Sequence, residues 1–211
     1  MTTETLTTDF PIETTTRSPG RNKPQQIGGR LWLPMFLMAL MAFAVGFILS
    51  LVQAGELSDN GGVINDTSES LKHLKAAFMF LGFASVFASI SFAISRILGE
   101  FRAGGGEVQE TVGGDVRTLK MPKSAKVFMA GMMMAMMLIL IPVILHFVFA
   151  ADVSDTAESL EDSEQRFIVL EGIRRLGVAV YLFAIAFGLA TIIQVLRFQG
   201  IRIRELVSNN N

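Results

Sequence analysis

Four long apolar runs alternate with polar stretches along the sequence. The runs cover residues 31–54, 76–95, 127–151 and 176–196, and none of them contains Asp, Glu, Lys or Arg. A helix rises 1.5 Å per residue, so roughly 20 apolar residues cross the hydrocarbon core of a bilayer, which is about 30 Å thick. Each run is long enough. The pattern therefore predicts an all-α integral membrane protein with four transmembrane helices.

The polar stretches divide the chain into five predicted segments. The N-terminal stretch is Thr-rich, is broken by Pro and Gly, and lacks the apolar centre of a signal peptide, so we expect disorder there. The second outer loop is expected to be helical from about Thr156, because acidic residues come early and basic residues late, as the helix dipole favours. The segments are a disordered cytoplasmic tail (1–30), a first transmembrane hairpin (31–98, outer loop 55–72), a cytoplasmic linker (99–124), a second transmembrane hairpin (125–199, outer acidic loop 152–175) and a cytoplasmic tail (200–211).

The two hairpins resemble one another in sequence. The stretch AGELSDN begins at Ala54, and the similar stretch AADVSDT begins at Ala150. Both copies contain two crossings and would have the same orientation, so the pattern predicts two parallel-repeated helical hairpins rather than an inverted repeat. Chance similarity between two apolar hairpins is the alternative.

A small β-hairpin is predicted in the cytoplasmic linker. The stretch EVQETVGGDVRTLKM places Gly113-Gly114 between two β-prone runs, which is the spacing of a two-residue turn. The preceding RAGGGE lacks the GxxxxGK[ST] spacing of a phosphate-binding loop, so we expect a flexible linker there.

Charge predicts the orientation of the chain in the membrane. Hydrophobic residues make up 51% of the sequence, the mean hydropathy is +0.48 and the formal net charge is only −1. Thirteen of the 18 Lys and Arg residues lie in the N-terminal tail, in the central region from Arg96 to Lys126, or from Arg197 to the C-terminal end, whereas the two outer loops hold 11 of the 19 acidic residues. By the positive-inside rule, we expect a multi-pass protein of the cell (inner or plasma) membrane with both termini cytoplasmic.

Small residues at four-residue spacing mark the expected packing faces. Helices in lipid gain little hydrophobic free energy from one another, so association depends on close backbone approach through small side chains. We expect these faces to meet within the bundle or in a homo-oligomer. The Ser hydroxyls could line a polar pore, or could bond carbonyls of their own helix. The helix-packing residues are Ala84, Ser85, Ala88 and Ser89 in the second helix and Ala184, Ala186, Gly188 and Ala190 in the fourth.

Methionines form a stripe on the third helix. Met129, Met133 and Met136 follow one another at i, i+4 and i+7, and His146 lies later in the same run. Thioethers select Cu(I), and an imidazole could add a ligand. Ten residues separate Met136 from His146, about 15 Å of helix, so the two cannot share one ion. We interpret the stripe as adaptable apolar packing and expect no metal site.

Two histidines remain as candidate ionisable sites. His146 lies near the outer end of its helix and could be a proton relay, a metal ligand or a quinone-site donor, because intramembrane ionisable groups are often functional. His73 falls in the predicted outer loop, with no acidic neighbour at ligand spacing. The preferred interpretation places both imidazoles at the membrane interface, in contact with headgroups or water.

The sequence lacks the residue sets that most enzymes require. It contains no Cys, no paired intramembrane carboxylates, no Ser-His-Asp set and no nucleotide loop, so we expect a non-catalytic protein without a cofactor. The favoured function is an accessory or structural subunit that packs against larger membrane proteins in the lipid bilayer, with no nucleic-acid partner. A homo-oligomeric small transporter or channel is the alternative, and a Cu(I)-handling membrane protein is a further one.

Overall fold

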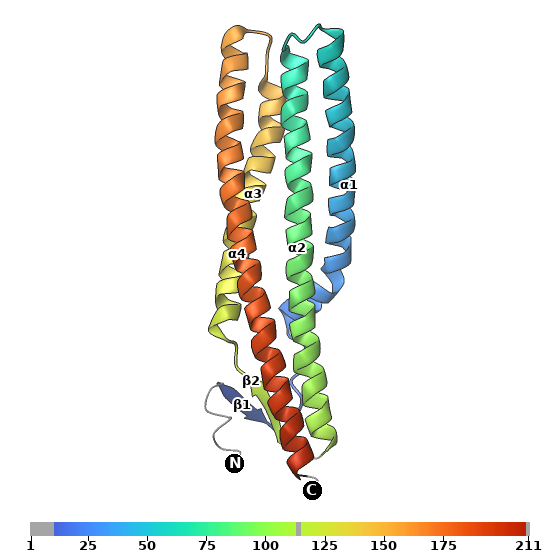
Figure 1. Cartoon of the computed structure of the whole chain (residues 1–211), viewed down its shortest axis with the longest axis vertical. Coiled ribbons are helices and arrows are strands. Elements are labelled where there is room, and N and C mark those ends of the chain that lie inside the picture. Colours follow the sequence, from blue (N-terminus) through green and yellow to red (C-terminus); the bar gives the residue numbers. More distant parts are fainter. Residues whose placement is uncertain (1–10, 113–114, 210–211) are drawn as a thin grey trace. The chain divides into compact units, whose positions relative to one another are not determined.

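The computed structural model describes residues 11–112 and 115–209. Within these residues, the chain forms four long helices and two short strands (Figure 1). All four helices are long and apolar enough to cross a membrane, as the apolar runs predict. In chain order, the elements are β1 (Ile12–Thr15), α1 (Lys23–Asp59), α2 (Asp66–Thr111), β2 (Val116–Leu119), α3 (Lys123–Asp152) and α4 (Ala157–Asn209).

Local capping fixes the short connection between α1 and α2. Helix α1 ends in a Schellman motif: the amide of Gly62 donates to the carbonyl of Leu57 at 2.7 Å, and both Gly61 (φ 62°) and Gly62 (φ 83°) are left-handed. Asn65 caps α2, because its Oδ1 accepts from the amide of Ser68 at 2.8 Å. The hairpin therefore closes through a six-residue connection, residues 60–65.

The helices extend well beyond the apolar runs. The predicted loops 55–72 and 152–175 are mostly helical, and α4 begins next to the predicted start at Thr156. Helix α2 continues through RAGGGE to Thr111, so the expected flexible linker is helical there. Helix α4 likewise runs through most of the predicted tail 200–211. Charged and polar residues therefore did not mark the helix ends.

The predicted β-hairpin of the linker is wrong. Its first strand is the last turns of α2, and its second strand is β2, while the turn glycines Gly113 and Gly114 lie outside the described residues. Strand β2 pairs instead with β1 from the N-terminal segment, antiparallel and in register from Ile12 opposite Leu119 to Thr15 opposite Val116. The N-terminal segment is therefore ordered as a strand and the start of α1, which differs from the predicted tail 1–30. Residues 1–10 lie outside the described residues.

The chain divides into two compact units, and each of the four helices contributes to both. Unit 1 comprises residues 1–32, 90–130 and 184–211, and unit 2 comprises residues 33–89 and 131–183. The core of unit 2 consists of residues at i, i+4 spacing on α2 and on α3, together with one aromatic residue of α4. Its buried members are Ala76, Phe80, Ala84, Ala135, Ile139, Val143 and Tyr181.

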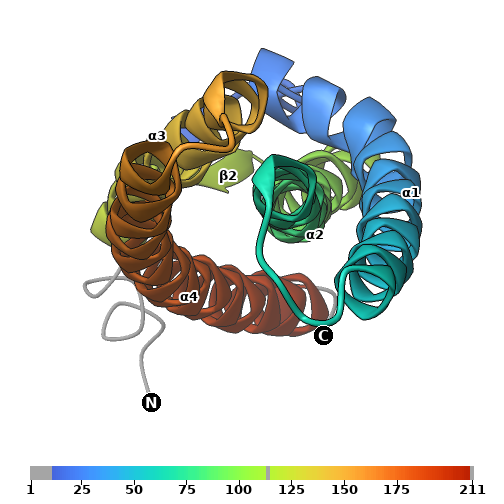
Figure 2. The same cartoon turned by 90° about the horizontal axis from the view of Figure 1, so that it is seen from above.

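Helix α2 contacts the other three helices within unit 2 (Figure 2). A Cβ at Gly82 would lie 2.6 Å from the ring of Phe43 on α1, so these two helices approach closely because Gly82 has no side chain. The Phe87 ring stacks on Tyr181 of α4 at 4.8 Å between centroids. Glycine and aromatic residues together therefore set the spacing around α2.

Most of the predicted small-residue positions are buried, although their mutual packing remains a prediction. Gly188 approaches Phe128 and Ile94 within unit 1, where a Cβ would lie 3.0 and 3.1 Å from them. Ser85 donates to the carbonyl of Leu81 in its own helix at 2.7 Å, in line with the local alternative to a pore lining. The buried positions are Ala84, Ser85, Ala88, Ser89, Ala184 and Gly188, whereas Ala190 is half-buried and Ala186 is exposed.

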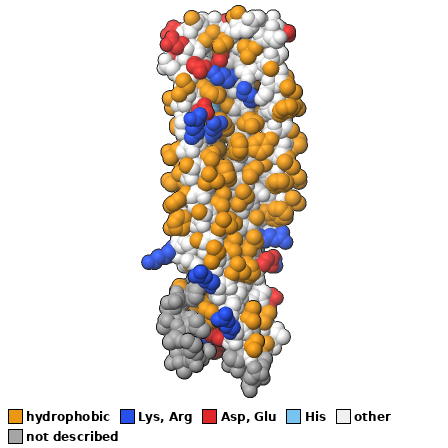
Figure 3. Space-filling model, viewed as in Figure 1, with side chains coloured by type: hydrophobic (Ala, Val, Ile, Leu, Met, Phe, Trp, Pro, Cys, Tyr) orange, Lys and Arg blue, Asp and Glu red, His pale blue; other side chains and the backbone are white. Residues whose placement is uncertain are grey.

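Large apolar side chains cover much of the outer helix surface in the view of Figure 3. In unit 2, Leu37 and Phe47 on α1 are 53% and 63% exposed, and Ile144 on α3 is 61% exposed. Contiguous apolar surface of this kind marks protein or membrane contact sites rather than a water-facing surface.

Candidate functional site: a buried histidine pair

Two histidines meet in the interior of unit 2. Nδ1 of His73 on α2 lies 2.8 Å from Nδ1 of His146 on α3, and both side chains are 0% exposed. The expected contact of these imidazoles with headgroups or water is therefore wrong. His73 is also helical rather than part of a loop, because α2 begins seven residues before it, at Asp66.

Regular helix geometry brings the two rings together. His73 lies on the same face of α2 as the core residues Ala76 and Phe80, which follow it at i+3 and i+7. His146 continues the buried row of Ile139 and Val143 on α3 at i+7 and i+3. The pair therefore extends the apolar core by one further turn on each helix.

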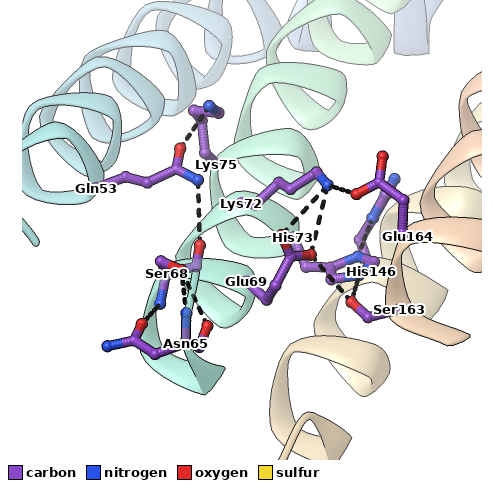
Figure 4. A network of polar contacts seen from close by, with 10 residues as sticks. All are labelled: Gln53, Asn65, Ser68, Glu69, Lys72, His73, Lys75, His146, Ser163 and Glu164. Atoms are coloured by element: carbon purple, nitrogen blue, oxygen red, sulfur yellow. Dashed lines mark hydrogen bonds and ion pairs between the residues drawn. The ribbon is translucent and has the colours of Figure 1, made fainter. Parts of the chain in front are cut away.

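A chain of polar contacts leads from the pair to a carboxylate (Figure 4). Nε2 of His73 lies 3.0 Å from Oγ of Ser163 on α4, and this hydroxyl donates to Oε2 of Glu69 at 3.2 Å. Lys72 pairs with Glu69 at 3.3 Å and also with Glu164, whose side chain is 54% exposed. The chain thus connects two fully buried rings to a group in contact with solvent.

The donors and acceptors of this chain assign a tautomer to each ring. The hydroxyl proton of Ser163 is directed to Glu69, so Ser163 can only accept from Nε2–H of His73. A neutral His73 then presents a lone pair at Nδ1, and Nδ1 of His146 must carry the proton between them. The Nε2 atom of His146 is therefore an acceptor, and it is buried without a hydrogen-bond partner among the described residues.

Aromatic rings enclose the pair. The Phe167 ring lies 5.6 Å from His73 and 5.4 Å from His146, and Phe80 lies 5.3 Å from His146, measured between centroids. The guanidinium carbon of Arg174 lies over the Phe80 ring, 3.8 Å from the ring centroid. Burial lowers the pKa of Arg174, and Glu171 partly offsets this shift. The two imidazoles are thus held in a water-excluded, mainly apolar setting.

Burial also favours the neutral form of His73, which precedes the apolar run of α2. Desolvation lowers the pKa of this imidazole below its usual 6.5; the Glu69 carboxylate raises it, and the Lys72 ammonium lowers it. The net shift is downward. The ring is therefore neutral near pH 7, as the tautomer assignment requires.

The sequence contained a signal for this site. The expectation that His73 has no acidic neighbour at ligand spacing is wrong, because Glu69 precedes it at i, i+4. His73 also continues the buried row of the second helix by one turn upstream. Ser163 falls in the segment expected to be helical from about Thr156. Extending the second helix upstream would have placed Glu69 and His73 on one face, but only the fold brings His146 and Ser163 to them.

The methionine stripe is not gathered into one cluster with His146. Met133 is 74% exposed, Met129 is 43% exposed, and the half-buried Met136 packs against the core of unit 2. Among the described residues, no three His, Cys, Asp or Glu side chains are placed to hold a metal ion. The stripe thus faces outward for the most part.

Replacing Met129, Met133 and Met136 together by Leu should leave assembly unchanged. Such swaps keep most of the apolar bulk and usually cost under about 1.5 kcal/mol each, and less where the side chain is exposed. Gel filtration and metal analysis of both purified proteins check this. Near-stoichiometric copper in the parent protein that is lost from the triple variant would restore the Cu(I) hypothesis.

Comparison with known proteins finds no relative: no family, no curated protein and no solved structure matches the chain.

Proposed function

We propose that the protein is a non-catalytic, multi-pass membrane protein that relays protons through the His73–His146 pair. The observation that carries the proposal is the oriented hydrogen-bond chain, which begins at a buried lone pair and ends at a carboxylate. Ionisable groups inside membrane bundles commonly mark proton paths. A structural ion-pair network would not need a buried acceptor without a partner.

The assigned tautomers suit proton movement from His146 toward Glu69. A proton that bonds to Nε2 of His146 allows the Nδ1–H bond of that ring to break, and this second proton moves to Nδ1 of His73. His73 then gives its Nε2 proton to Oγ of Ser163. Ser163 gives its hydroxyl proton to Oε2 of Glu69, so both rings end neutral and a carboxylic acid forms at the solvent-connected end.

Tyr181 is a second buried polar group in the core of unit 2. Its hydroxyl group is the other buried polar atom of unit 2 that has no partner among the described residues. Its ring stacks on Phe87 of α2. Phe87 lies seven residues, about 10 Å, farther along α2 than Phe80, whose ring lies beside His146.

Proton flux into proteoliposomes tests the relay. A potassium gradient with valinomycin drives protons across the membrane, and an internal pH dye reports their movement. We expect the parent protein to exceed empty liposomes. His146→Gln should lower the flux about tenfold or more. An imidazole can accept a proton at one nitrogen and release another from its second nitrogen, whereas the Gln amide cannot.

The matched control is Ser85→Ala. Among the described residues, this buried hydroxyl bonds only the carbonyl of Leu81 in its own helix and lies outside the chain of contacts, so its loss should leave the flux unchanged. Equal flux from His146→Gln and the parent protein would refute the relay. So would parent flux no greater than that of empty liposomes.

The proposal includes the orientation predicted from charge, with both termini cytoplasmic. Because the chain lacks Cys, single cysteines can report it. Cysteines at Asp59 and Asp162, which are both exposed, should react with an impermeant maleimide added outside intact cells. A cysteine at Gly104, where an added Cβ meets nothing within 4 Å, should react only after the cells are opened. External labelling of Gly104 would reverse the orientation.

Membership in a larger membrane complex is the second candidate function. It is favoured by the exposed methionines Met133, Met134 and Met137 of α3, which are 74%, 55% and 61% exposed. Methionine is common at adaptable protein interfaces. Purification in mild detergent should then bring larger subunits with the chain. A homo-oligomer with no other protein would instead favour the small transporter or channel.

A further inference from the structure

A second feature, independent of the histidine pair, is an open cavity of about 350 Å³ in unit 1. Volumes of this order are typical of small-molecule sites. All of its lining residues belong to unit 1. The cavity spans the junction between apolar and polar sequence, because Phe128 and Val195 lie within apolar runs, while Asn22 and Arg202 lie outside them.

Two guanidinium groups line the polar part of this cavity. Arg102 makes no hydrogen bond or ion pair within the described part of the chain, and its Nε is buried without a partner. Arg202 is 3% exposed, and its bonds go to neutral amide oxygens, at 2.7 and 3.0 Å to Gln109 and at 3.2 Å to Gln199. The nearby Glu205 carboxylate forms its ion pair with Arg117.

Burying a cation costs free energy unless an anion accompanies it. Burial lowers the pKa of Arg202 to about 10, against the smaller opposing effect of Glu205. The fold nevertheless keeps the side chain in place: a Cβ on Gly105 would overlap both Arg202 and Gln199. The site thus holds positive charge ready for an anionic group.

We propose that this cavity binds one anionic phospholipid, with its phosphate between Arg102 and Arg202 and an acyl chain along Phe128 and Phe198. Guanidinium groups bind phosphate oxygens in bidentate geometry, and apolar rings suit a hydrocarbon chain. The position of the cavity at the ends of the apolar runs matches the headgroup level of a bilayer. This inference rests on the proposed membrane insertion but not on the proton relay.

Native mass spectrometry of the delipidated full-length protein tests the proposal. The probes are phosphatidylglycerol, phosphatidylcholine with the same acyl chains, and inorganic phosphate. We expect one phosphatidylglycerol per chain, with clearly weaker binding of phosphatidylcholine and of inorganic phosphate. Equal binding of the two lipids would show that the charge is not recognised, and equal binding of inorganic phosphate would show that no lipid is needed. Either result overturns the proposal.

Variants separate the headgroup from the acyl chain. Arg102→Gln should weaken phosphatidylglycerol binding about tenfold, because it removes a charged partner of the lipid but no hydrogen bond or ion pair within the described protein. Arg197→Gln, an exposed position on α4 that does not line the cavity, makes the same change in net charge and should bind as the parent does. Ala125→Phe should fill the apolar part and block the lipid. Binding of phosphatidylglycerol by Arg102→Gln or Ala125→Phe that equals that of the parent protein contradicts the proposal. Lipid binding and proton flux are separate measurements, so failure of one proposal can be distinguished from failure of the other.

Discussion

Replacing either histidine of the pair by Leu should lower the free energy of unfolding by about 1–3 kcal/mol. His73→Leu leaves Nδ1–H of His146 without an acceptor, and His146→Leu leaves Nδ1 of His73 without a donor. Each single change therefore strands a buried polar group inside the aromatic enclosure. Unfolding of the purified protein in mixed detergent micelles, followed by circular dichroism, gives both values.

The double variant distinguishes a true pair from two independent core residues. With Leu at both positions, neither half of the Nδ1 contact remains, so the combined loss should be smaller than the sum of the single losses. Contacting polar residues typically show coupling of about 0.5–3 kcal/mol. Strictly additive losses would mean that the 2.8 Å contact contributes nothing specific to the fold.

Gly177→Leu should destabilise unit 2 by about 1–3 kcal/mol through overpacking. A Cβ at this position of α4 would lie 2.8 Å from Ile139 and 3.3 Å from the backbone of Leu138 on α3. The backbone of α3 cannot move aside as a flexible side chain could, so the two helices would have to separate. The melting temperature in detergent measures the loss.

Gly172 supplies the matched control on the same helix. An added Cβ there meets nothing within 4 Å, so Gly172→Leu should be neutral or slightly stabilising, since Leu favours a helix over Gly by roughly 0.5–1 kcal/mol. If both variants melted at the same temperature, the close approach of α3 and α4 at Gly177 would be disproved.

The helices were predictable because length and polarity alone identify them. Every apolar run lies inside one helix of the structure, and no charged residue interrupts it. The helix ends were less predictable. Gly104, Gly105 and Gly106 favour a break by propensity, yet Gly105 and Gly106 are helical beside Arg202 and Ser18, where a side chain on either glycine would overlap. Tertiary packing therefore overrides propensity at this end of α2.

Strand pairing was beyond local reasoning. Strands β1 and β2 have four residues each and lie about a hundred residues apart in the sequence, so neither stretch alone identifies the strand with which it pairs. The adjacent EVQET had similar β propensity and a suitable glycine turn, which made the local hairpin attractive. It is helical in the structure, where Gln109 bonds the amide of Arg117 and the guanidinium of Arg202.

Prediction of the candidate site requires both the helical phase of the residues and the tertiary fold. The i, i+4 relation of Glu69 and His73 can be read from the sequence, but α2 had to be extended past its apolar run to use it. At the 96-residue offset that separates Ala54 from Ala150, the counterpart of His146 is Ser50, which donates to the carbonyl of Gly46 in its own helix. The proposed repeat therefore offers no histidine partner for His146. Symmetry reasoning therefore pointed away from a pair.

Solid-state NMR of the protein labelled with ¹⁵N at histidine, in lipid bilayers near pH 7, tests the central claim most directly. We expect two neutral rings, with His146 protonated at Nδ1 and His73 at Nε2. We also expect a coupling through the hydrogen bond that joins the two Nδ1 atoms. A proton on Nε2 of His146, or two rings without mutual coupling, would contradict the oriented chain and the proton relay proposed from it.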